Sequence, residues 1–146
     1  MHLFQRDDLK DSTTSLFADE IQVRFQDVDA AGVAYFARVF DYLHAAYEGL
    51  LESVGEPLPA VLAERRWAAP LRHAELDYFL PLRFGDRLTV HVALAHVEPT
   101  EITFGYRLED AEGRVAAVGQ TVHTFVDPKT WQRCELPSAL RRVLSG

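Results

Sequence analysis

The sequence contains one cysteine and one methionine, and it has no apolar run long enough to cross a membrane. A single Cys134 excludes an internal disulfide and a cysteine-rich metal site. No basic start followed by an apolar stretch marks a secretory signal, so a cytoplasmic location is expected. A Gly-x-Ser-x-Gly elbow and a glycine-rich phosphate loop are both missing, which argues against a serine hydrolase and a phosphate-loop nucleotide site.

The charge balance is acidic, with 22 Asp and Glu residues against 15 Lys and Arg residues and a formal net charge of −7. This excess argues against nucleic acid and acidic membrane surfaces as partners. Any ligand that carries phosphates therefore needs a local group of Arg or Lys side chains. At 146 residues, 48% of them hydrophobic, the chain is expected to fold as one globular domain.

The pattern of apolar residues divides the chain into a polar start and a folded remainder. Residues 1 to 19 are rich in Asp, Ser and Thr and are predicted to form a flexible tail, followed by a single domain over 20 to 146. Residues 21 to 25 alternate apolar and polar, which predicts a short strand. Residues 35 to 54 carry apolar side chains at three- and four-residue spacing, which predicts a long helix that ends before Gly55.

The second half of the chain predicts a run of antiparallel strands. Alternating or strongly apolar segments, separated by turns rich in Gly, Pro and Asp, cover residues 71 to 79, 88 to 94, 102 to 108 and 115 to 126. A short helix is predicted over 136 to 144. One long helix packed against one antiparallel sheet is an α+β arrangement.

The segment from Phe25 to Phe36 is the most informative, because two carboxylates and a glycine turn precede the long helix there. A helix N-terminus presents unpaired backbone N–H groups and partial positive charge. Those groups can bind the oxygen of a polarised carbonyl, with Asp27 or Asp29 beside it. Alternatively, either aspartate can simply cap the helix. The residue types alone leave both interpretations open.

This segment resembles the signature of the 4-hydroxybenzoyl-CoA thioesterase family, Asp-x-Asp-x-x-Gly-(Ile/Val)-x-(Tyr/Phe), which stands here as Asp27, Asp29, Gly32, Val33 and Tyr35. The family adopts the hotdog fold, an antiparallel sheet wrapped around one long central helix. Within the family, the chain is most similar to the 1,4-dihydroxy-2-naphthoyl-CoA hydrolases. The residues that carry this similarity are Gly32 to Phe36, His44, Ala46 to Glu48, Pro70, Leu71, His73 and Ala74.

The resemblance implies an acyl-CoA thioesterase that releases free acid and coenzyme A from an aromatic thioester, such as a dihydroxynaphthoyl or hydroxybenzoyl thioester. It makes Asp29 the catalytic carboxylate, acting as a nucleophile or as a general base on water. Backbone N–H groups near Tyr35 and Phe36 would polarise the carbonyl, while Asp27 and Gly32 would support the turn. No cofactor is implied beyond the coenzyme A of the substrate. No metal is expected, since no His or Glu stands at a convincing ligand spacing.

Three further residues are candidates for the acyl pocket: His44, Glu48 and His73. His44 and Glu48 are four positions apart on the predicted helix, so they can instead form a surface pair worth about 0.2–0.5 kcal/mol. Some hotdog thioesterases place their catalytic Glu on the central helix, which makes Glu48 the reserve catalytic residue. His73 falls on a predicted strand, where a structural histidine is the alternative.

The phosphates of coenzyme A lack an obvious partner in this sequence. Well-known family members use basic residues at the turn between the third and fourth strands, but here residues 96 to 101 are acidic. The remaining basic candidates are Lys129, Arg133, Arg65 and Arg66, or arginines of a partner subunit. The resemblance also implies a homodimer or homotetramer with active sites at a subunit interface.

Three other functions are weighed against an aromatic acyl-CoA thioesterase. One is a thioesterase for aliphatic acyl-CoA, and another is a hotdog protein that binds acyl-CoA without hydrolysing it. A hotdog dehydratase would need a His paired with an acidic residue in a different motif, which this sequence lacks. An assay of thiol release over a panel of acyl-CoAs distinguishes a thioesterase for aliphatic acyl-CoA from a protein that only binds acyl-CoA.

Overall fold

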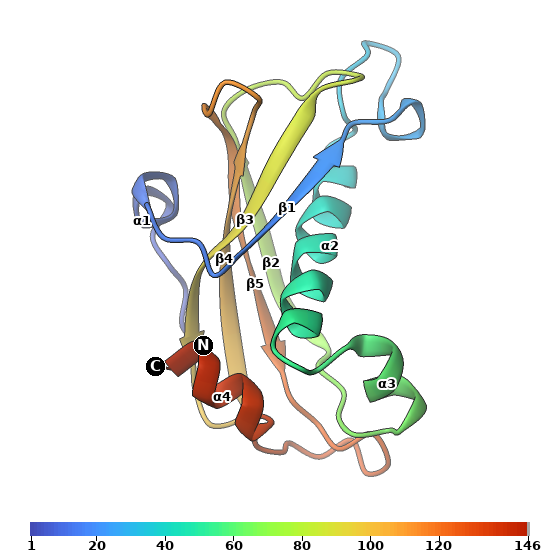
Figure 1. The fold of residues 1–146 in the computed structure, drawn as a ribbon, viewed down its shortest axis with the longest axis vertical. Helices are drawn as coiled ribbons and strands as arrows, with labels where there is room; N and C mark the ends of the chain where they lie inside the picture. The colour runs from blue at the N-terminus through green and yellow to red at the C-terminus, as the bar shows by residue number, and fades with distance from the viewer. Residues whose placement is uncertain (146) are drawn as a thin grey trace.

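A five-stranded antiparallel sheet with one long helix across it makes up most of the molecule (Figure 1). The structure is a computed structural model and describes residues 1–145. The strand order in the sheet is β1, β3, β4, β5, β2, so β1 and β2 form the two edges. The strands are β1 (Phe17–Gln22), β2 (Leu71–Tyr78), β3 (Arg87–Val97), β4 (Glu101–Glu109) and β5 (Val115–Thr124). The α+β prediction is confirmed.

The central helix is α2 (Arg38–Ser53), which packs against one face of the sheet, called here the inner face (Figure 1). Its buried residues are Val39, Tyr42, Leu43, Ala46, Tyr47, Leu50 and Leu51. They share a hydrophobic core with Phe104, Tyr106 and Leu108 of β4. Burial of each large apolar side chain contributes about 1.5–3 kcal/mol, so this stripe fixes the helix on the sheet.

The helix is shorter at its start than its apolar periodicity predicts. Phe36 belongs to that periodicity, yet its side chain is 61% exposed and precedes the first residue of α2. The backbone N–H of Tyr35 donates to the carbonyl of Asp27 at 2.7 Å, which ties this stretch to the preceding turn. Because of this hydrogen bond, Tyr35 stays with the preceding loop, and α2 begins only at Arg38.

Three shorter α-helices, α1 (Arg6–Asp11), α3 (Leu58–Ala63) and α4 (Ser138–Ser145), and one turn of 3-10 helix, η1 (Phe25–Asp27), complete the described helices. The predicted C-terminal helix is confirmed as α4, whereas α3 was not predicted. Helix α3 begins after Pro57 and contains Pro59, which is tolerated in a first helical turn. None of the described helices combines the length and apolar character that crossing a membrane requires.

The first residues are not the loosely held tail that their polar composition predicts. The segment 1–16, called here the N-terminal strap, lies over the face of the sheet opposite α2, the outer face (Figure 1). Leu9 of α1 is only 2% exposed, and Gly105 leaves room for its side chain. The backbone of Phe4 exchanges two hydrogen bonds with the side-chain amide of Gln120 on β5. The tail prediction is wrong because these contacts lie about a hundred residues away in the sequence.

Strand β1 also begins earlier than predicted, at Phe17 rather than at Ile21. Burial alternates along the whole strand, with Phe17, Asp19 and Ile21 on the less exposed side. Asp19 interrupts the apolar periodicity, so the sequence pattern conceals the first four residues of the strand.

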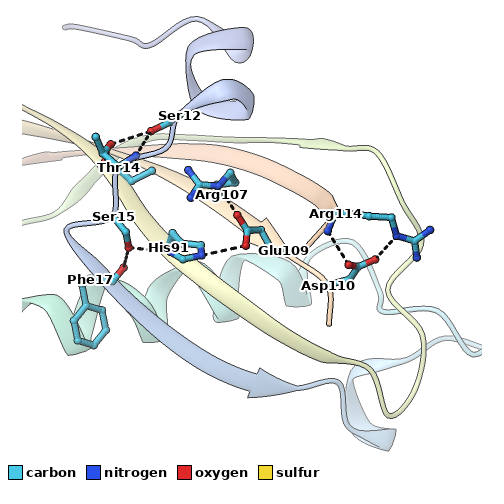
Figure 2. Close-up of polar contacts among 10 residues, drawn as sticks. Ser12, Thr14, Ser15, Phe17, His91, Arg107, Glu109, Asp110 and Arg114 are labelled. Carbon is cyan, nitrogen blue, oxygen red and sulfur yellow. Dashed lines mark hydrogen bonds and ion pairs between the residues drawn. The ribbon is translucent and has the colours of Figure 1, made fainter. Parts of the chain in front are cut away.

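Polar contacts fasten the link between α1 and β1 to the sheet (Figure 2). The Oγ atom of Ser15 lies 2.8 Å from Nδ1 of His91 on β3. The other ring nitrogen of His91 lies 3.4 Å from the Glu109 carboxylate, which also accepts a hydrogen bond from Nε of Arg107 at 2.9 Å. These contacts cross from β3 to β4 and hold the end of the strap in place.

Candidate active site

The segment between β1 and α2 folds into a tight turn. Val28 and Ala34 pair as an isolated antiparallel bridge, and the Asp29 N–H donates to the Val33 carbonyl at 2.9 Å. Gly32 has φ +77°, a conformation that favours glycine, and its N–H donates to the Asp29 carbonyl at 3.0 Å. Gly32 thus supports the turn that presents Asp29.

Asp29 lies at the exposed tip of this turn, and one of its carboxylate oxygens is occupied. Oδ1 accepts hydrogen bonds from the N–H of Ala31 at 2.8 Å and of Val33 at 3.4 Å. Such bonds fix the side-chain orientation of an aspartate in a turn. Within residues 1–145, no group donates a hydrogen bond to Oδ2 of Asp29. This oxygen is free to contact a substrate or a water molecule.

Asp27 has a different environment, because it is 9% exposed and accepts several hydrogen bonds. Its Oδ2 accepts from the Arg24 N–H at 3.0 Å and from the Tyr42 hydroxyl at 2.8 Å. Its backbone carbonyl accepts from the Tyr35 N–H. Asp27 therefore ties the turn to α2 through one carboxylate oxygen and its backbone carbonyl.

Neither aspartate caps α2, so the structure excludes the simplest alternative interpretation of this motif. The N-cap residue is Ala37, which provides no side-chain cap. Within the described chain, the backbone N–H groups of Phe36 and Ala37 donate to no acceptor. The carbonyls of Tyr35 and Phe36 are bonded, to the N–H groups of Arg38 and Val39. Two unpaired N–H groups thus stand at a fixed helix start, where a negative oxygen is stabilised.

A shallow apolar hollow of about 330 Å³ adjoins the start of α2. It is lined by Val33, Ala34, Val39, Tyr78, Phe79, Leu80, Pro81 and Leu82. The side chains of Tyr35 and Phe36, on the same stretch of chain, are 47% and 61% exposed. Exposed aromatic rings beside an apolar hollow favour binding of an apolar or aromatic group.

The structure does not bring His44 or Glu48 next to Asp29 within one subunit. Both side chains are exposed on α2. The rise of an α-helix places Glu48 about 15 Å beyond Arg38, the first residue of α2. The ring of His44 stacks on Tyr47 with 5.2 Å between centroids, and within residues 1–145 no hydrogen bond or ion pair joins it to Glu48.

His73 lies on the outer face of the sheet, away from α2. Leu76 faces α2, since it lies beside Leu43 near Gly119, and alternation along β2 places His73 on the other side. Its Nε2 is 3.0 Å from the Glu75 carboxylate. The structure therefore separates His73 from the turn that carries Asp29.

The segments that carry the basic residues proposed for phosphate binding come after the last residue of α2, whereas the Asp29 turn precedes its first residue (Figure 1). Arg66 forms ion pairs with Glu56 and Glu64, close to α3. Arg65 precedes Arg66, and Ala68 of the same segment pairs with Val126, which also pairs with Arg133; Lys129 lies in the loop between Val126 and Arg133. In one subunit these residues and Asp29 do not form one site.

A larger polar groove of about 760 Å³ runs beside the motif turn, and the sequence did not indicate it. It contains Arg24, Arg38 and Arg87, together with acidic residues that include Glu20 and Asp110. The mixture of charges gives no clear preference for an anion.

Within residues 1–145, no group of three His, Cys, Asp or Glu side chains is arranged to hold a metal ion. Burial raises the pKa of the Cys134 thiol, which disfavours a thiolate there.

The site also contains Tyr42 and Tyr78, whose hydrogen bonds the sequence did not indicate. Tyr42 lies on the buried stripe of α2, where its spacing from Val39 was a usable signal. Tyr78 ends the edge strand β2, and its hydroxyl donates to the Phe36 carbonyl at 2.7 Å. No local pattern in the sequence signals that contact, because 42 positions separate the two residues.

Sequence comparison finds relatives that match most of the chain. The chain is 36% identical over 126 residues to a 1,4-dihydroxy-2-naphthoyl-CoA hydrolase of Rippkaea orientalis, covering 85% of this chain and 91% of that protein. A protein of the same name from Synechococcus elongatus is 36% identical over 120 residues, with coverages of 82% and 88%.

Solved structures give the same result. The crystal structure of Slr0204, a 1,4-dihydroxy-2-naphthoyl-CoA thioesterase from Synechocystis, superposes with a TM-score of 0.82 at 31% identity and covers 88% of this chain and 95% of that one. The gentisyl-coenzyme A thioesterase BH1999 shares the fold, with a TM-score of 0.78 at 21% identity and coverages of 85% and 98%. The hotdog fold implied by the resemblance is confirmed. The family model described as thioesterase-like superfamily matches residues 23–144, and the chain belongs to that superfamily.

Proposed function

We propose that this protein hydrolyses an aromatic acyl-CoA thioester, with Asp29 as its catalytic carboxylate. The observation that carries the proposal is a free Asp29 oxygen on the turn that leads into α2, together with unpaired N–H groups at the start of that helix. A carboxylate and a preformed site for a developing oxyanion are the two groups that thioester hydrolysis requires.

Two routes are compatible with this arrangement. As a general base, Asp29 accepts a proton from water while the water oxygen attacks the thioester carbon; the C–S bond then breaks, and the leaving sulfur receives the proton. As a nucleophile, Asp29 attacks the same carbon and expels the thiolate, and water then hydrolyses the mixed anhydride. In both routes the Phe36 N–H stabilises the negative oxygen, and the products are the free acid and coenzyme A.

The aromatic nature of the acyl group is supported by the surroundings of the site and by the relatives. The apolar hollow beside α2 and the exposed rings of Tyr35 and Phe36 suit a flat apolar group. Relatives more than 30% identical bear the name of a hydrolase for a two-ring aromatic thioester. An aliphatic acyl group and binding without hydrolysis are the competing functions.

We also propose that the protein works as a homodimer or homotetramer. The edge strand β2 carries exposed apolar side chains, with Leu71 55% and Tyr78 45% exposed. An uncovered edge strand presents unpaired backbone groups that favour pairing with another strand. Light scattering coupled to size-exclusion chromatography measures the number of subunits.

The function is tested by measuring free thiol released from benzoyl-, naphthoyl- and fatty-acyl-CoAs. The wild type is expected to prefer the aromatic thioesters, and Asp29→Asn is expected to lose at least about a hundredfold in kcat. The matched control is Asp8→Asn, the same change on the exposed surface of α1, which is expected to keep wild-type activity. Melting temperatures of both variants check that the fold is intact.

Each result discriminates between the functions. Full activity in Asp29→Asn contradicts the site, whereas a preference for fatty-acyl-CoAs contradicts the aromatic substrate. Binding of acyl-CoA by calorimetry, with no thiol release from any thioester, identifies a non-catalytic binding protein.

A further inference from the structure

The hydroxyl of Tyr78 donates a hydrogen bond of 2.7 Å to the backbone carbonyl of Phe36. The two residues come from different elements, since Tyr78 is the last residue of β2 and Phe36 precedes α2. The Phe36 carbonyl also accepts the Val39 N–H at 3.3 Å, a long bond within the first turn. The Tyr78 hydroxyl is therefore the shorter of the two contacts on this carbonyl.

This bond acts on the planar peptide group that contains the Phe36 carbonyl and the unpaired Ala37 N–H, while the unpaired Phe36 N–H belongs to the preceding peptide group, with the Tyr35 carbonyl. On one side of Phe36, the Tyr35 carbonyl accepts the Arg38 N–H at 2.8 Å and the Tyr35 N–H donates to Asp27. On the other side, the Phe36 carbonyl is bonded to Tyr78. Both peptide groups that flank Phe36 are thus anchored, which fixes the direction of its N–H.

The anchor comes from the sheet and not from the helix itself. Tyr78 pairs with Ala117 of β5, and the backbone N–H groups of the next two residues, Phe79 and Leu80, both donate to the Ala116 carbonyl. Burial raises the pKa of the Tyr78 hydroxyl, so it stays protonated and able to donate. The ring also lines the apolar hollow beside Val39. One side chain therefore joins the wall of the hollow to the start of α2.

We propose that Tyr78 is a positioning residue: its hydrogen bond to the Phe36 carbonyl fixes the peptide group between Phe36 and Ala37, and so holds the unpaired N–H groups of both residues toward the thioester oxygen. This inference rests on the proposed thioesterase function and assigns Tyr78 no direct contact with the reacting atoms. Loss of one neutral hydrogen bond that acts fully in the transition state corresponds to about a five- to tenfold loss of rate.

The first experiment compares Tyr78→Phe with the wild type on the aromatic thioester that the wild type hydrolyses best. The variant keeps the ring and removes only the hydroxyl, so we expect kcat to fall about five- to tenfold with KM unchanged. The matched control is Tyr106→Phe, which removes a hydroxyl bonded to Thr121 in the core and is expected to leave kcat at the wild-type value. Melting temperatures and subunit number are measured for both variants.

The second experiment has a readout that a merely structural role would not move. In the Asp29→Asn background, which slows turnover, infrared spectroscopy records the carbonyl stretch of bound benzoyl-CoA labelled with ¹³C at the thioester carbon. Binding is expected to lower the stretching frequency, because the N–H polarises the carbonyl. Adding Tyr78→Phe is expected to reduce that shift, while adding Tyr106→Phe leaves it unchanged.

The outcomes separate the inference from the function beneath it. A wild type that releases no coenzyme A contradicts the proposed function. An active wild type contradicts the role of Tyr78 alone if Tyr78→Phe has the same kcat, if only its KM rises, or if the carbonyl frequency does not change.

Discussion

The Tyr42 hydroxyl of α2 donates a 2.8 Å hydrogen bond to the buried carboxylate of Asp27, and this contact joins the central helix to the turn that presents Asp29. The same carboxylate oxygen accepts the Arg24 N–H. The position of Asp29 relative to α2 therefore depends on a side chain two residues away. Burial, followed by this hydrogen bond and the negative charge of Asp27, raises the pKa of Tyr42, so the hydroxyl remains a donor.

Tyr42→Phe is expected to lower the free energy of unfolding by about 1.5–3 kcal/mol, because it leaves a buried carboxylate without one of its donors. Urea denaturation at neutral pH measures the change. Tyr47→Phe is the matched control: Tyr47 is also buried on α2, but its hydroxyl has no hydrogen-bond partner within residues 1–145. Equal effects of the two substitutions would show that the bond to Asp27 is unimportant.

Leu9→Ala is expected to destabilise the protein by about 2–4 kcal/mol, because the Leu9 side chain of the strap is buried against Gly105 of the sheet. The control is Leu62→Ala on α3, where the side chain is 70% exposed and little change is expected. Urea unfolding measures both. A Leu9→Ala variant as stable as the wild type would indicate that the strap is detached in solution, as its composition alone suggests.

The buried His123 predicts a loss of stability in acid. Burial lowers its pKa from 6.5 to about 4, so the unfolded chain takes up this proton before the folded protein does. The contribution is fully present above pH 6.5 and is lost as the pH falls from 6.5 to about 4, a change of about 3 kcal/mol. Free energies of unfolding at several pH values in this range measure it.

The comparison for this effect is His123→Gln, which removes the titrating group. Other groups, mainly carboxylates, titrate in both proteins, so the difference between the two pH profiles isolates His123. Parallel profiles would contradict the assignment. The buried ring also stacks on Tyr47 with 4.5 Å between centroids, so the variant is expected to be less stable than the wild type at pH 8.

Glu48→Gln distinguishes the reserve catalytic residue from Asp29. Glu48 is exposed on α2 and far along the helix from the turn, so its substitution is expected to leave kcat at the wild-type level. Thiol release from the preferred aromatic thioester measures it beside Asp29→Asn. Complete loss of activity in Glu48→Gln would indicate that Glu48 is the catalytic residue. Its helix would then complete the site formed by the Asp29 turn of another subunit.

The sequence predicted the sheet and α2 well, because their burial follows periods of two and of 3.6 residues. The prediction failed where a residue packs against a partner that is far away in the sequence. Leu9 looks like part of a polar tail until Gly105 is placed beneath it, and α3 contains a proline within its first turn. These errors come from tertiary packing, which no local window contains.

The candidate site was predicted unevenly for the same reason. The motif and its family resemblance placed Asp27, Asp29 and Gly32 in one turn, and the structure has that turn. Only coordinates show that Ala37, and not an aspartate, occupies the N-cap position of α2. His73 alternates to the outer face of the sheet, an orientation that its spacing from Leu76 already implied.

The strap has a consequence for the order of events during synthesis. Phe4 leaves the ribosome before its partner Gln120, which lies 116 positions later in the chain. Folding of a nascent domain waits for the last segment that its contacts need. The apolar side chains of the strap therefore stay without their docking site until β5 has emerged.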